Sequence, residues 1–313
     1  IIIPDGKLGY IPFHTLLTEP VAAQELDNFP QHPYLFQKSQ LSLAFSVATL
    51  WDQKQHLDAP TTKILAYAPA FRRPAPDRNL TRSQLSELPF NQLEASFLKN
   101  NFAAEVVLDE KATSRHFLNH APDAEVLHLS THGKVNRENP DLSFIAFSNI
   151  PDDDQEAFKI TVGDIYAQNL PCEMVVLSAC ETGIGKAIRG EGIMSIARAF
   201  AYAGTRSVVT SLWSVNEEKT TKVMQAFYEH LSQQTGTTKD AALQAAMQDY
   251  LNDPQLDLLK KSPKYWAAFT IIGDPAPIQL MGERFKMFPY WMVGIGLVSL
   301  LLIGRFLAKK RAW

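Results

Sequence analysis

The sequence predicts an open α/β fold in which helices cover both faces of a mostly parallel sheet, followed by a transmembrane helix. The main observation is that three runs, residues 125–130, 174–178 and 207–211, are continuously apolar, as strands buried on both faces are. Helical patterns separate or follow these runs, and strands that alternate with helices favour a sheet covered on both faces. An uncharged run near the C-terminus adds the predicted transmembrane helix.

The other elements follow from their own patterns along the chain. Apolar side chains recur at helical spacing in residues 85–100, Thr113 is a candidate N-cap, and the turn signal at Gly273 ends the last strand. The six predicted strands cover residues 63–69, 106–108, 125–130, 174–178, 207–211 and 269–272. The predicted helices cover residues 85–100, 112–120, 161–168, 191–203, 217–232 and 238–251.

The N-terminal region, residues 1–60, does not join this alternation of strands and helices. It begins with isoleucine and with a turn signal at residues 4–6, and residues 40–50 fit a helix or a strand. We expect this region to be the N-terminal remnant of an upstream subdomain that packs on the sheet, with a cut N-terminus. The predicted core domain then covers residues 61–280.

The C-terminal segment differs in character from the rest of the chain. Residues 288–304 carry no charge, and residues 306–308 extend the run beyond Arg305. A membrane span needs about 20 apolar residues, and an arginine near one end can reach the headgroups. We therefore expect a transmembrane helix over residues 288–308 and a basic tail over residues 309–313. The alternative, a buried terminal helix, is disfavoured because the run has no polar face.

The charges around this run predict an orientation for a single-pass membrane anchor. Positive residues after the apolar run outnumber those just before it; they are Arg305, Lys309, Lys310 and Arg311 against Arg284 and Lys286. The positive-inside rule then places the tail in the cytoplasm and the core domain on the opposite side, the periplasm in a Gram-negative bacterium. Membrane lipid is accordingly an expected partner of the C-terminal helix.

Composition excludes several classes of function. The net charge of −3 gives no indication of a nucleic-acid partner. The glycine-rich stretch 183–190 fails both phosphate-loop patterns, since Ile188 and Cys180 stand where glycine is required, and no zinc-ligand spacing is present. No cofactor or metal is therefore predicted. Cys172 and Cys180 flank one predicted strand, whose ends lie roughly 25 Å apart, so they cannot form a disulfide and Cys180 is expected to be a free thiol.

Two polar motifs follow predicted strands at the edge where sites form in open α/β sheets. Ser-Thr-His-Gly occupies residues 130–133, and Ser-Ala-Cys-Glu-Thr-Gly occupies residues 178–183. If the two strands are neighbours, the imidazole of His132 and the thiol of Cys180 reach the same edge. A histidine beside a thiol raises its thiolate fraction, and backbone N–H groups of Gly133 and Cys180 are placed to stabilise an oxyanion. His128 reads as a packed core residue and Cys172 as a structural thiol.

These motifs resemble the caspase, separase, legumain and gingipain pattern, in which one apolar strand ends in His-Gly and another ends in Ala-Cys. His132 and Cys180 stand 48 residues apart, and the sequence around Cys180 is similar to the CHAT branch. The likeness covers roughly residues 1–275 in the family's order. Its further matching segments are residues 4–6, 11–13, 189–192, 197–200, 203–209, 211–215 and 265–269.

The resemblance implies a caspase-like three-layer α/β/α domain with a mostly parallel six-stranded sheet. It also implies a cysteine endopeptidase with a protein or peptide substrate, in which Cys180 attacks the carbonyl and His132 assists proton transfer. CHAT domains commonly follow tetratricopeptide repeats, so upstream repeats or their ligands are expected partners. The alternative is a catalytically silent CHAT interaction or scaffold module that works with those repeats.

Substrate preference is predicted from one further match to separase-like relatives. In those relatives an acidic side chain shortly after a Leu-Trp motif lines the pocket for a basic P1 residue. Here Leu212-Trp213 is followed by Glu217, although Asn216 stands where family members often carry aspartate. The alternative reading is that Glu217 only complements the N-terminus of the following helix, as acidic residues there do.

Overall fold

The computed structural model describes residues 1–55, 63–71, 85–148, 158–178, 183, 185–188, 192–214 and 217–280. Of residues 186–188, 192–194 and 217 it describes the backbone only. Cys180 and the segment 288–308 therefore lie outside the described residues.

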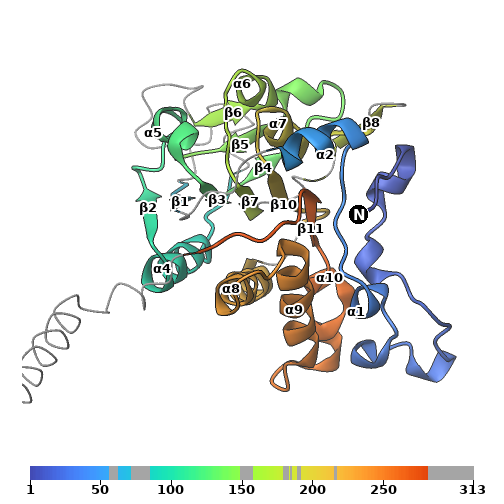
Figure 1. Cartoon of the computed structure of the whole chain (residues 1–313). Coiled ribbons are helices and arrows are strands. Elements are labelled where there is room, and N and C mark those ends of the chain that lie inside the picture. Colours follow the sequence, from blue (N-terminus) through green and yellow to red (C-terminus); the bar gives the residue numbers. More distant parts are fainter. Residues whose placement is uncertain are drawn as a thin grey trace, which may run out of the picture.

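A six-stranded sheet forms the centre of the molecule (Figure 1). Its spatial order is β2, β1, β3, β7, β10, β11, and every neighbouring pair is parallel except β10 and β11. The strands are β1 (Ile64–Pro69), β2 (Ala104–Asp109), β3 (Val126–Ser130), β7 (Met174–Ser178), β10 (Ser207–Ser211) and β11 (Phe269–Gly273). The prediction of a mostly parallel six-stranded sheet is confirmed.

Helices cover both faces of this sheet, which gives three layers (Figure 1). One face carries α5 (Ser114–His120), α6 (Val162–Tyr166) and α7 (Ile196–Tyr202), and the other carries α4 (Asn91–Asn101), α8 (Glu217–Gln233) and α9 (Lys239–Asn252). Shorter helices are α1 (Leu35–Lys38), α2 (Val47–Lys54) and α10 (Pro263–Trp266).

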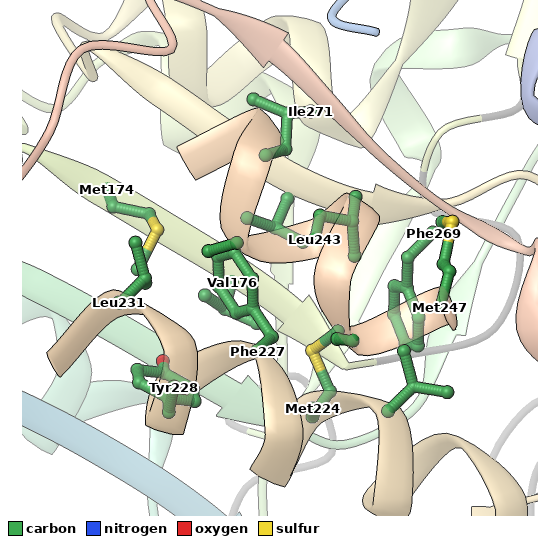
Figure 2. Packing of buried hydrophobic residues seen from close by; sticks show 14 of the residues in the cluster. Met174, Val176, Met224, Phe227, Tyr228, Leu231, Leu243, Met247, Phe269 and Ile271 are labelled. Carbon is green, nitrogen blue, oxygen red and sulfur yellow. The ribbon is translucent and has the colours of Figure 1, made fainter. Parts of the chain in front are cut away.

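Alternate residues of the central strands enter different cores, which explains why the strands read as continuous apolar runs. In β7, Met174 and Val176 pack with α8 and α9, whereas Val175 and Leu177 pack with the helices of the opposite face. Figure 2 shows Met174 and Val176 in the core between the sheet and the helices α8 and α9, which also contains Phe227 and Leu243. Burial of each such side chain stabilises the fold by about 1.5–3 kcal/mol.

Two helices begin later than their patterns predicted. The first begins at Asn91 rather than at residue 85 because Pro89 disfavours helical backbone in the residue before it. The second begins at Ile196 because the preceding residues pair as a hairpin of β8 (Gly185–Ile188) and β9 (Gly192–Ser195). A small antiparallel sheet of β4 (Gly133–Lys134), β5 (Phe144–Ala146) and β6 (Lys159–Thr161) was also not predicted.

The N-terminal region packs on the same sheet. Leu43 forms an isolated bridge with Ile272 of β11 and another with Ile2. Phe36 and Leu41 are buried in the core shared with α8 and α9. The region is otherwise built from short helical turns, and the domain boundary near residue 60 stays a prediction.

The predicted transmembrane anchor is corrected. No helix in the described part of the chain is long and apolar enough to cross a membrane. A span needs about 20 apolar residues, and the longest described helix, α8, has 17 residues and begins with Glu217 and Glu218. The predicted membrane localisation and its orientation are corrected with the anchor, whereas membrane lipid as a partner stays a prediction. Residues 288–308 themselves lie outside the described residues.

Candidate active site

The carboxyl ends of β3 and β7 lie side by side. The two strands pair in parallel, and their last residues, Ser130 and Ser178, are register partners. The sequence left this adjacency as a condition, and the structure meets it. His132 follows Ser130 by two residues, and Cys180 follows Ser178 by two residues in the chain.

His132 is half-buried and is held by two neighbours. Its Nε2 lies 2.7 Å from the carbonyl oxygen of Ser86, and its ring packs on Phe71 with a centroid distance of 4.8 Å. Because a carbonyl oxygen only accepts hydrogen bonds, Nε2 carries the proton. In the neutral ring, Nδ1 is then the basic nitrogen. His132 therefore has a fixed orientation and one nitrogen available to take up a proton.

The surroundings of His132 favour its neutral form. Burial lowers the pKa of His132 below its ordinary value, the hydrogen bond to the Ser86 carbonyl opposes this shift, and the nearby charge of Lys134 adds to it. A neutral imidazole at neutral pH is the form that a general base requires. Neither Ser86 nor Phe71 was predicted as a site residue. The signal that could have excluded residues 85–88 from the predicted helix is Pro89, which disfavours helical backbone in the residue before it.

The amide of Gly133 is left outside the β4–β5 ladder. The N–H of Ala146 donates to the carbonyl of His132 at 2.9 Å, and Gly133 stands opposite Ile145. Antiparallel pairs alternate between hydrogen-bonded and non-hydrogen-bonded positions, so Gly133 occupies a non-hydrogen-bonded position. Its N–H accordingly points away from β5.

The chain after β7 returns across the carboxyl end of β10. The N–H of Gly183 donates to the carbonyl of Ser211 at 2.9 Å. A Cβ at Gly183 would lie 3.0 Å from both the Ser211 oxygen and Cγ2 of Thr210. This close approach requires glycine. It fixes where the Ser-Ala-Cys-Glu-Thr-Gly motif ends, above β10.

The segment before α8 is anchored by two hydrogen bonds. The N–H of Leu212 donates to the carbonyl of Ala268 at 2.9 Å, and Nε1 of Trp213 donates to the carbonyl of Lys264 at 3.0 Å. Glu217 is the first residue of α8. Its side chain lies outside the described residues, so its role in substrate binding stays a prediction.

Cys172 stands in contrast to the candidate nucleophile. It lies at the amino end of β7, is fully buried, and its Sγ is 4.0 Å from the carbonyl of Ala121. Burial, together with the negative charge of Glu173, raises the pKa of Cys172 to about 12. The thiol is therefore protonated and inert at neutral pH.

A cavity of about 880 Å³ lies at the carboxyl ends of β1 and β2. It shares Phe71 with the contacts of the imidazole and combines apolar and acidic walls. The residues that line it include Pro69, Phe71, Leu88, Leu108, Glu87, Asp109 and Glu110. Nothing in the sequence pattern indicated it. Within the described ranges, no group of three or more histidine, cysteine or acidic side chains is placed to hold a metal ion.

The fold is that of the caspase-like α/β proteins. The structure is similar to that of the complex of the RgpB pro- and mature domains from Porphyromonas gingivalis, with a TM-score of 0.50 and 14% sequence identity. The similarity covers 76% of this chain and 56% of that chain. Separase of Saccharomyces cerevisiae, in its complex with securin, gives a weaker likeness, with a TM-score of 0.48 and 12% identity over 75% of this chain and 14% of that chain.

The sequence comparison gives the family. The model of the CHAT domain family matches residues 1–274, and the chain belongs to that family. Tetratricopeptide repeat protein 28 from Homo sapiens and its counterpart from Mus musculus are each 24% identical to it over an alignment of 322 positions, which includes 90% of this chain. The chain spans 12% of the length of these curated relatives.

Proposed function

We propose that this CHAT domain is a cysteine endopeptidase with Cys180 as nucleophile and His132 as its base. The observation that carries the proposal is the pairing of β3 with β7, whose last residues are register partners. In sequence, each strand is followed two residues later by one member of the dyad. The fixed orientation of His132, with Nε2 donating to Ser86, supports the same assignment.

The proposed reaction has two stages. His132 accepts the proton of the Cys180 thiol at Nδ1, and the sulfur attacks the substrate carbonyl to form a C–S bond. The tetrahedral intermediate collapses as the C–N bond breaks, and His132 delivers the proton to the leaving amine. Water then attacks the thioester carbonyl while His132 takes its proton, the C–S bond breaks to release the carboxyl product, and the departing thiolate recovers the proton from His132.

The oxyanion of each tetrahedral intermediate needs hydrogen-bond donors. We assign this role to the backbone N–H groups of Gly133 and Cys180. The N–H of Gly133 is not used in the β4–β5 ladder, which supports the assignment, because an N–H bonded within the sheet is unavailable to a substrate. Loss of one such donor typically costs about 10²–10³ in kcat.

We further propose that Glu217 faces a basic P1 side chain. Support comes from its place at the start of α8, four residues after the anchored Trp213. Glu218 offers a matched control because it is half-exposed and pairs with Lys219 at 2.6 Å. Changes in preference for basic substrates should therefore follow Glu217 and not Glu218.

Covalent labelling tests the proposed function. An acyloxymethyl ketone probe, which modifies a reactive thiolate, should label the wild-type chain at Cys180, and the modified peptide is identified by mass spectrometry. Cys180→Ala and His132→Ala should prevent labelling, whereas Cys172→Ala should leave it unchanged. Labelling that persists in Cys180→Ala rejects the assignment.

A second candidate is a catalytically silent interaction module. The observation that favours it is that the curated relatives are tetratricopeptide repeat proteins, of which this domain corresponds to a small part. Under this alternative, binding to repeat-containing segments or their ligands is the output. A chain that binds such a partner, and that neither cleaves a peptide library nor reacts with the probe in its presence, supports the alternative.

A further inference from the structure

One buried carboxylate joins the carboxyl ends of β3 and β7. Glu94 extends from α4, and its side chain is only 3% exposed. The hydroxyl of Ser130 donates to Oε2 of Glu94 at 2.7 Å, and the hydroxyl of Ser178 donates to Oε1 at 3.2 Å. Since Ser130 and Ser178 are register partners, both carboxylate oxygens are engaged on adjacent strand ends.

A histidine lies beneath this bridge. Nε2 of His128 lies 3.4 Å from Oε2 of Glu94 as an ion-pair contact, and in the described part of the chain this nitrogen has no hydrogen-bond partner. Nδ1 of His128 lies 3.0 Å from the hydroxyl of Tyr228 on α8. Both rings are buried. The network therefore connects two strands of the sheet with two helices of one layer.

The electrostatics indicate that Glu94 is ionised. Burial acts to raise the pKa of Glu94, but the adjacent His128 and the hydrogen bonds from Ser130 and Ser178 outweigh it, and the pKa lies below its usual value. A buried carboxylate is costly unless it is paired and hydrogen-bonded. A well-packed apolar group at this position is often as stable as such a network, so stability alone does not account for it.

The position of the network relates it to the candidate dyad. Ser130 precedes His132 by two residues, and Ser178 precedes Cys180 by two residues. Glu94 itself lies beneath the strand ends and is too deeply buried to touch a substrate. A shift of about 1 Å between reacting groups can reduce a rate about 10²-fold. A contact that fixes the two strand ends can therefore change the reaction rate strongly.

We propose that Glu94 is a positioning residue that holds the carboxyl ends of β3 and β7 together and thereby sets the separation of His132 and Cys180. This inference rests on the proposed peptidase function. Ser130 and Ser178 are its contacts to the two strands, and His128 with Tyr228 fixes the carboxylate from below. The network therefore acts on the reaction through geometry.

The test measures the rate of probe labelling in variants of the whole chain. Glu94→Gln removes the negative charge and leaves one of the two serine hydroxyls without its acceptor, while the side-chain volume is kept. The maximal labelling rate should fall at least tenfold, whereas the half-saturating probe concentration should change less than threefold. Ser130→Ala and Ser178→Ala should each produce part of this loss, and the loss in the double variant should not exceed that of Glu94→Gln.

Glu173→Gln provides the matched control. Glu173 is a similarly buried carboxylate, but it lies at the amino end of β7, where its Oε2 is 3.0 Å from Nη1 of Arg206. This variant should lower thermal stability and leave the maximal labelling rate unchanged at temperatures well below unfolding. Equal losses of labelling in Glu94→Gln and Glu173→Gln would mean that Glu94 contributes only stability, which rejects positioning.

The remaining outcomes separate this inference from the proposed function. If the wild type is labelled at Cys180 and Glu94→Gln is labelled at the same rate, positioning is rejected and the peptidase stands. If the wild type is not labelled, the dyad is rejected and positioning with it. Should Glu94→Gln fail to fold, Ser178→Ala decides the question, because it removes a single weaker hydrogen bond, and an unchanged maximal rate rejects the inference.

Discussion

The two ends of β7 each lie near a cysteine in the sequence and a buried carboxylate in the structure, but the carboxylates have different partners. At the amino end, Cys172 is buried and Glu173 pairs with Arg206, which also contacts Asp274 at 2.9 Å. At the carboxyl end, Ser178 contacts Glu94, and Cys180 follows in the sequence. Each end thus combines a cysteine with a buried carboxylate network.

The partners of the two carboxylates differ. The guanidinium of Arg206 is always charged, and its donors suit the two carboxylates around it. Glu94 instead contacts two serine hydroxyls and the ring of His128. In open α/β sheets, sites form at the carboxyl edge. We therefore expect the carboxylate network at the amino end of β7 to contribute to stability, and the one at the carboxyl end to affect the site.

The largest expected difference between the two ends of β7 is in the alanine variants of their cysteines. Cys180→Ala should reduce peptide turnover by about 10⁴-fold or more, as removal of a nucleophile does elsewhere. Cys172→Ala should leave turnover within about twofold, because the buried thiol at the amino end is protonated. Turnover by both variants is measured on a peptide library. Full activity in Cys180→Ala contradicts the assignment of function to the carboxyl end.

The amino end should respond in stability instead. Arg206→Ala leaves Glu173 and Asp274 buried without their shared cation. Removing one partner of a buried pair costs about 3–5 kcal/mol. For a domain of this size that corresponds to a decrease of roughly 6–20 °C in Tm.

Calorimetry measures the change in Tm, and probe labelling at low temperature serves as the functional readout for Arg206→Ala. Labelling should remain at the wild-type rate in this variant. A strong loss of labelling without a loss of stability would show that the amino end also acts on the site.

Specificity should also belong to the carboxyl edge. Glu217→Gln should lower kcat/KM for substrates with Arg or Lys at P1 by tens-fold, since truncating one partner of a buried charge pair costs about 2–5 kcal/mol. Glu218→Gln, which alters a half-exposed pair with Lys219, should change it less than twofold. A library screen that gives cleavage after aspartate or after an apolar residue overturns the proposed pocket.

The sequence predicted the sheet well because its central strands are buried on both faces. Residues 174–178 are continuously apolar since alternate side chains enter two different cores, and this pattern is visible without a structure. The β4–β6 sheet and the β8–β9 hairpin were missed because strands of two to four residues are too short for a periodic signal.

The candidate site was predictable only in its parts that follow strands. His132 was found because it follows a buried strand. Whether that strand lies beside the strand before Cys180 could not be decided from the sequence, and the structure shows that β3 and β7 pair. Glu94 was not found, since a glutamate in an amphipathic helix is usually solvent-exposed and its partners lie 36 and 84 residues away in the chain. His128 was read as a core residue. It is buried as expected, but its contact with Glu94 was missed.

The smallest expected effect concerns the pH dependence of the carboxyl edge. Because the pKa of His132 lies below its ordinary value of about 6.5, the acid limb of kcat/KM should also lie below pH 6.5. Phe71→Leu opens the packing on the imidazole while keeping an apolar side chain, so the limb should move upward toward pH 6.5. The same depressed pKa reduces stability as pH falls from about 6.5 toward the folded-state value, because only the unfolded chain then binds the proton. Cys172→Ala, at the amino end, should leave the limb where it is. An acid limb above pH 6.5 in the wild type would contradict the burial of His132 as the cause.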